Sequence, residues 1–76
     1  MRLVHVQALS GFRLAVEFED GSRGEVSLAK DLWGPAFEAL RDPAYFAQVA
    51  LSEFGAPTWP NRTDIAPDAI YAEIMG

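Results

Sequence analysis

The sequence contains no cysteine and a single histidine, His5. Without thiols the chain can form no disulfide, no thiolate zinc site and no cysteine nucleophile, and one imidazole excludes multi-histidine metal sites. Long apolar runs are missing too. No stretch reaches the roughly 18 to 20 consecutive apolar residues that cross a bilayer, and the N-terminus lacks the apolar block of a secretion signal. We therefore predict a cytoplasmic protein without a membrane partner.

Basic side chains are scarce as well. Six lysines and arginines stand against eleven aspartates and glutamates, which gives a formal net charge of -5. A phosphate backbone would be repelled on average, so we expect no direct binding of nucleic acid. Most of the negative charge lies from residue 29 onward, where three basic residues accompany seven acidic ones. Such an acidic half would speed association with a cationic partner.

The size and composition of the chain are those of one small globular unit. Half of the 76 residues are apolar, 12% are aromatic and 22% are charged. A chain this short can build only one hydrophobic core, and its composition argues against disorder. Neither an internal repeat nor a low-complexity linker divides it. We therefore predict a single domain over residues 1–76.

Apolar and polar side chains alternate with a period of two along the first 28 residues. This alternation predicts three strands, at about 3–8, 12–18 and 22–28, joined as an antiparallel meander. The even-numbered side chains of each strand are mainly apolar, so we expect them, Val4 included, on one buried face. The odd-numbered side chains then face solvent.

The phase of the alternation also constrains the second hairpin loop. A two-residue loop at Asp20 and Gly21 would set the inward Phe18 opposite the outward Arg23, so the loop length must be odd. We predict a three-residue loop over 19–21. It is a type I turn in which Gly21 takes the left-handed conformation as a G1 bulge.

The same arithmetic is applied to the first hairpin. It predicts a three-residue loop over 9–11, with Gly11 left-handed and Ala8 opposite Phe12. His5 then lies on the outer face of the sheet, where no second imidazole or thiol is available to complete a site. We expect neither a catalytic nor a metal-binding role for it.

The period changes after Leu28, and the rest of the chain predicts short helices. Proline can begin a helix because its missing donor costs nothing at the first position, and both Pro43 and Pro67 stand at such starts. Trp33 is assigned to core packing. The predicted helices span about 36–41, 43–48 and 67–75, and a returning edge strand spans about 49–54. The fold class is therefore α+β, with the helices on one face of the meander.

Three blocks of the sequence resemble a known family in their order and spacing. They are the strand end with Phe18, Asp20 and Gly21, the segment from Leu40 to Phe46, and the block Trp59, Pro60, Asn61, Asp64, Pro67 and Asp68. Together they are similar, almost end to end, to the bacterial domain of unknown function numbered 2442. The resemblance implies a small cytoplasmic bacterial protein with a sheet-plus-helix fold, of a kind suspected to be the antitoxin-like half of two-gene modules.

Two positions depart from the pattern of that family. Arg62 stands where similar proteins have glycine, which puts a tight left-handed turn there in doubt. Ala66 replaces the small polar residue usual before Pro67, and this removes a side-chain cap worth about 1 kcal/mol.

The segment around Trp59 is the candidate partner-binding site. Pro57 and Pro60 stiffen it, so presenting the Trp59 ring to a partner would cost little ordering entropy. Two positions of the ring stay open: half exposed at an edge, or packed as a lid over the core. Aromatic side chains with a polar neighbour are typical of interface hot spots. The candidate partner-binding residues are Trp59, Pro60, Asn61, Arg62 and Asp64.

These observations favour a protein-interaction module over an enzyme. We expect an antitoxin-like or regulatory subunit that binds a small partner protein, encoded by an adjacent gene, with no cofactor, no metal and no catalytic residue. One alternative is a small carboxylate-metal hydrolase using Asp64 and Asp68, although both carboxylates also suit the start of a helix. A second alternative is a structural homo-oligomer.

Overall fold

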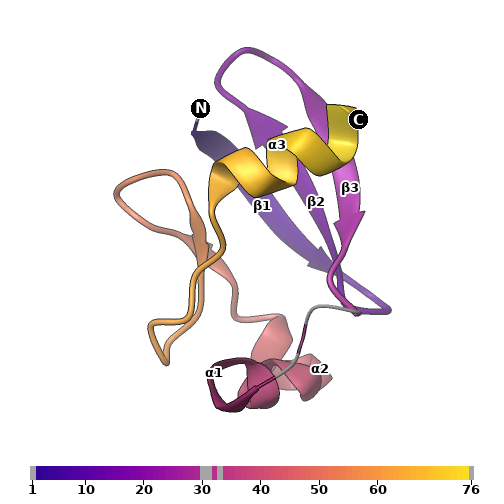
Figure 1. The fold of residues 1–76 in the computed structure, drawn as a ribbon, viewed down its shortest axis with the longest axis vertical. Helices are drawn as coiled ribbons and strands as arrows, with labels where there is room; N and C mark the ends of the chain where they lie inside the picture. The colour runs from indigo at the N-terminus through magenta and orange to yellow at the C-terminus, as the bar shows by residue number, and fades with distance from the viewer. Residues whose placement is uncertain (1, 30–31, 33, 76) are drawn as a thin grey trace.

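The computed structural model describes residues 2–29, 32 and 34–75, and it begins with an antiparallel sheet. Trp33, assigned above to the core, lies outside the described residues. The sheet has the strand order β1-β2-β3, which confirms the predicted meander (Figure 1). Its strands are β1 (Leu3–Leu9), β2 (Arg13–Phe18) and β3 (Arg23–Ser27).

Short elements make up the rest of the fold. They are α1 (Pro35–Glu38), the 3-10 helix η1 (Ala39–Arg41), α2 (Pro43–Phe46), β4 (Ala50–Leu51), β5 (Pro57–Thr58) and α3 (Pro67–Met75). All three predicted helical regions are therefore present, and the fold is α+β. The strand predicted over 49–54 is confined to β4 and pairs with β5 in a separate small sheet. It ends early because Ser52 Oγ accepts hydrogen bonds from the backbone N–H groups of Phe54 and Ala56 and turns the chain.

The second hairpin has the predicted register. Leu14 pairs with Val26, and the Phe18 N–H donates to the Ser22 carbonyl over 2.8 Å. Gly21 has a φ of 89°, and its N–H donates to the Phe18 carbonyl over 2.9 Å. The three-residue loop and its left-handed glycine are thus confirmed.

The first hairpin differs from its prediction by two residues. Ala8 pairs with Leu14 rather than with Phe12, and the loop covers residues 10–12. Gly11 is left-handed as expected, with φ 75°, but Phe12 is left-handed as well, with φ 58°. A shift of two leaves the alternation unchanged, so periodicity cannot separate the two registers. Packing separates them, because the Phe12 ring makes an edge contact with Phe46 at 5.5 Å.

A bulge at the start of β1 overturns the prediction for Val4. Leu3 pairs with Phe18 and His5 pairs with Glu17, so Val4 has no partner between them. Beyond this bulge Leu3 turns inward and is 2% exposed, whereas Val4 is 54% exposed. His5 is on the outer face, as predicted.

The helices divide between the face and one end of the sheet. α3 crosses the inner face, while α1 and α2 lie beyond the ends of the strands (Figure 1). The expectation that helices cover the even-numbered face therefore holds for α3. A cluster of buried apolar side chains joins the two regions: Leu3, Leu14, Val16, Phe18, Val26, Leu28, Leu32, Leu40, Phe46, Trp59 and Ile70.

Candidate functional site

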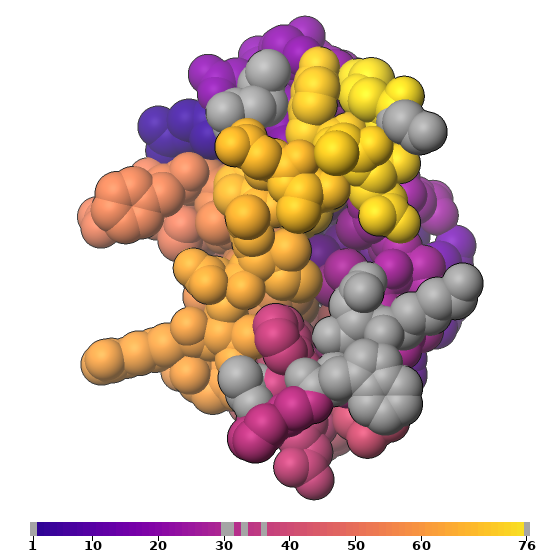
Figure 2. Space-filling view, in the orientation of Figure 1, coloured from indigo at the N-terminus to yellow at the C-terminus, as the bar shows by residue number. Residues whose placement is uncertain are grey.

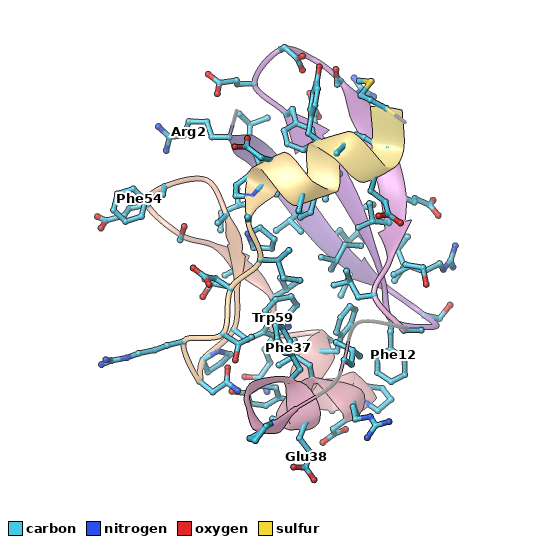
Figure 3. All side chains as sticks on the ribbon, in the orientation of Figure 1. Arg2, Phe12, Phe37, Glu38, Phe54 and Trp59 are labelled. Atoms are coloured by element: carbon cyan, nitrogen blue, oxygen red, sulfur yellow. The ribbon has the colours of Figure 1, made fainter. Side chains whose placement is uncertain are left out.

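Trp59 is part of the core. Its side chain is 3% exposed, its indole N–H donates to the Phe46 carbonyl over 2.9 Å, and its ring lies 5.7 Å from the Phe46 ring. The labelled side chain points into the molecule (Figure 3). Of the two positions left open for this ring, the structure has the one packed over the core. The reason is that the end of α2 supplies the acceptor that a buried indole needs.

The residues after Trp59 form a tight hydrogen-bonded turn. The Arg62 N–H donates to the Trp59 carbonyl over 2.9 Å, the Trp59 N–H donates to the Thr63 carbonyl over 3.0 Å, and Asn61 Oδ1 accepts from the Thr63 N–H over 3.0 Å. Arg62 has a φ of 67°, so the left-handed turn is kept with arginine in the place of glycine. Pro60, Asn61, Arg62 and Asp64 are exposed. Pro60, Asn61 and Arg62 belong to this turn, which follows the buried Trp59, and Asp64 comes after it in an isolated antiparallel bridge to Thr58.

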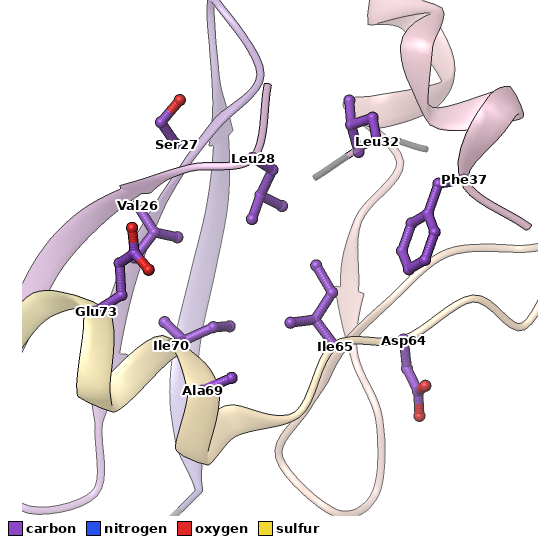
Figure 4. A pocket seen from close by; sticks show the side chains of 10 residues that line it. All are labelled: Val26, Ser27, Leu28, Leu32, Phe37, Asp64, Ile65, Ala69, Ile70 and Glu73. Carbon is purple, nitrogen blue, oxygen red and sulfur yellow. The ribbon is translucent and has the colours of Figure 1, made fainter. Parts of the chain in front are cut away.

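An apolar groove of about 380 Å³ lies between β3, α1 and α3, and Asp64 is one of the residues that line it. The sequence alone did not predict this groove. The groove is lined by Val26, Ser27, Leu28, Leu32, Phe37, Asp64, Ile65, Ala69, Ile70 and Glu73. Its two carboxylates lie toward opposite ends, Glu73 near Val26 and Asp64 beyond Ile65 (Figure 4). The only local signal for it is the i, i+3 spacing that puts Ile70 and Glu73 on one face of α3.

A second exposed feature is the loop after β4. Phe54 is 76% exposed at its tip and projects from the molecule (Figure 3). The loop is tied to the N-terminus, because the Leu3 N–H donates to the Gly55 carbonyl over 2.8 Å and Arg2 Nη2 donates to the Glu53 carbonyl over 2.8 Å. The exposed aromatic of this region is therefore Phe54 and not Trp59.

The carboxyl of Asp20, in the second hairpin loop, has a perturbed pKa. Hydrogen bonds from Ser22, and a further one from the Tyr71 hydroxyl over 3.0 Å, hold the pKa of the Asp20 carboxyl below its ordinary value of 3.8. Asp68 lies in the first turn of α3 and Asp64 at the groove. Across residues 2–29, 32 and 34–75, no group of three or more histidine, aspartate or glutamate side chains is arranged to hold a metal ion. None of the helices in that same part of the chain is long and apolar enough to cross a membrane.

Comparison with known proteins agrees with the resemblance drawn from the sequence. No curated protein and no solved structure matches the chain. A family model described as a protein of unknown function, DUF2442, matches residues 3–76. Because this match covers nearly the whole chain, the protein belongs to the DUF2442 family.

Proposed function

We propose that this domain is a non-enzymatic protein-interaction module, an antitoxin-like or regulatory subunit that binds a small basic partner protein encoded by an adjacent gene. The observation that carries the proposal is the groove, which combines an apolar floor with a carboxylate toward each end. Concave apolar surfaces with a few polar groups are typical of binding sites.

The chemistry of the groove favours a cationic, apolar ligand. Phe37 and Ile65 line the groove and are only half-buried, and covering the apolar surface that they still expose would give affinity without direction. Asp64 and Glu73 are exposed, so each would contribute only about 0.2–1 kcal/mol with a lysine or arginine of the partner. The larger electrostatic effect is on the association rate. Asp64 and Glu73 belong to the second half of the chain, which carries most of the net charge of -5 and attracts a cationic partner over a distance.

The test uses the product of the adjacent reading frame, co-expressed and then titrated by calorimetry. We expect Glu73→Gln to weaken this binding by about threefold to fivefold, and the loss to shrink at high salt. Glu53→Gln is the matched control. It removes the same charge from the Phe54 loop, away from the groove, and should bind as the native chain does.

Two results would count against the proposal. One is the absence of a complex with the co-expressed protein. The other is equal affinity for the two charge variants. A rise in melting temperature with Mg²⁺ or Mn²⁺ that Asp64→Asn abolishes would instead favour the carboxylate-metal hydrolase.

A further inference from the structure

β3 is an outer strand, and the register shows which of its backbone groups face outward. The Phe18 N–H donates to the Ser22 carbonyl and the Leu28 N–H donates to the Phe12 carbonyl, each over 2.8 Å. Hydrogen-bonded pairs alternate along an antiparallel ladder, so the even-numbered residues of β3 bond to β2. The N–H and C=O groups of the odd-numbered residues, Arg23, Glu25 and Ser27, therefore point away from the sheet.

These outward groups have no hydrogen-bond partner among the described residues. The side chains of the same strand do not cover them. Glu25 pairs with Arg13 over 2.9 Å and Arg23 approaches Glu17 at 3.8 Å, both across to β2 on the outer face. The opposite edge of the sheet differs, because β4 lies beside β1 (Figure 1). An unpaired strand edge is a template for an added strand.

The open edge runs along the groove. Val26 and Leu28 turn their side chains inward and line it, and α3 faces them with Ile70 and Glu73. In the space-filling view the yellow surface of α3 stands next to the purple surface of β3 (Figure 2). A strand added about 4.8 Å from β3 would place every second side chain on the groove side.

We propose that β3 receives an extended segment of a basic partner protein as a fourth strand, with alternate apolar side chains in the groove and one lysine or arginine beside Glu73. This assignment rests on the proposed function and adds the mode of recognition to it. The negative charge of Asp64 and Glu73 at the groove favours a basic segment over a second copy of this chain. A second copy of this chain would bring another net charge of -5 to an acidic rim, whereas a cationic segment complements it.

The direct test is a synthetic nonapeptide, acetylated and amidated, of the sequence Thr-Val-Thr-Leu-Thr-Lys-Thr-Val-Thr. Its apolar and basic side chains share one face when it is extended. We expect amide NMR signals of Arg23, Glu25 and Ser27 to shift on titration and their hydrogen exchange to slow. The peptide with glutamate in place of lysine should bind at least about threefold more weakly, and Glu73→Gln should abolish the difference. Absence of shifts at millimolar peptide, or shifts confined to α3, would overturn the proposal.

Backbone variants separate the edge from the groove. Glu25→Pro removes an outward N–H and leaves the β2–β3 ladder intact, while Glu25→Ala removes the same side chain and keeps the N–H. We expect the proline variant to lose at least about tenfold in affinity for the peptide and for the co-expressed protein, and the alanine variant to bind normally. Ser27→Pro repeats the test at a second outward position should Glu25→Pro fail to fold.

The outcomes distinguish this inference from the function it rests on. Should Glu73→Gln weaken the complex while Glu25→Pro does not, the groove works without an added strand and only this inference is wrong. Should neither variant weaken it, both are wrong. A native chain that sediments as a dimer, with Glu25→Pro monomeric, would assign the edge to a second copy and overturn the choice of partner.

Discussion

Two glycines with similar backbone conformations allow a direct measurement of what close packing contributes at the Phe54 loop. Gly55 has a φ of 74° and Gly21 a φ of 89°. A Cβ added at Gly55 would lie 2.5 Å from the Arg2 Cβ and 3.1 Å from the Leu3 backbone nitrogen. At Gly21 nothing lies within 4 Å of the added atom. Alanine therefore meets conformational strain at both positions and a steric clash at only one.

The expected losses follow from these distances. Left-handed strain on alanine costs about 1 kcal/mol at either site. At Gly55 the neighbouring backbone cannot retreat freely, because the Leu3 N–H donates to the Gly55 carbonyl over 2.8 Å. Overpacking of this kind adds about 1–3 kcal/mol. We expect Gly21→Ala to lose about 1 kcal/mol of unfolding free energy, and Gly55→Ala about 2–4 kcal/mol.

Urea denaturation followed by circular dichroism measures both losses. For a domain of this size the free energy falls by about 1 kcal/mol per molar urea, so the midpoint should fall by about 1 M for Gly21→Ala and by at least about 2 M for Gly55→Ala. Equal midpoints for the two variants would refute the reasoning. They would mean that the Phe54 loop yields to the added methyl group and is not held against β1.

Three further outcomes are expected. Trp59→Phe should lower the unfolding free energy by about 2 kcal/mol in urea denaturation, since it loses the hydrogen bond to the Phe46 carbonyl and part of the packed volume; a neutral result would contradict the buried position of the indole. The pKa of Asp20 is lower in the folded chain than in the unfolded one, so its contribution to stability is present above about pH 4 and is lost as the pH falls below it. Melting temperatures of native and Asp20→Asn protein should therefore converge between pH 5 and about pH 2, and a constant gap would speak against this linkage. His5→Ala should change stability by less than about 0.5 kcal/mol and leave partner binding intact, which calorimetry on the same complex checks.

The meander and the second hairpin could be predicted because local residues determine them. The inward side chains of β2 and β3, together with a glycine in the third loop position, are compatible with one register. In the first hairpin the same argument predicted the wrong register, because Phe12 and not Gly11 takes the third loop position and makes an edge contact with Phe46, more than thirty residues away. The predicted burial of Val4 is wrong for a related reason, since a bulge reverses the inward-outward alternation of a strand without changing its composition.

The candidate site was harder to predict because it is built from distant segments. The groove is lined by residues of β3, α1 and α3. No short pattern in the sequence predicts that Glu73 lies near Val26. The burial of Trp59 stayed open for the same reason. Trp59 and Phe54 both lie near proline and glycine, and only the carbonyl of Phe46, placed by the tertiary fold, decides which one is buried.

The division of the helices between the face and the end of the sheet has a consequence for local unfolding. α3 is attached to the second hairpin through the edge contact of Tyr71 with Phe18, at 4.9 Å, and through the hydrogen bond to Asp20. α1, η1 and α2 contact one another in sequence, and α2 is attached to Trp59 and Phe12. Contacts grouped in this way favour local opening of each group in native-state hydrogen exchange, while the single buried cluster that joins them opens only on global unfolding.

The groove is lined from both of these groups, by Ile70 of α3 on one side and by Phe37 of α1 on the other. A ligand bound there would contact both groups at once. It would slow amide exchange in α2 and α3 alike, because binding stabilises the closed state of each group. Binding at the groove would then couple the local opening of the two groups.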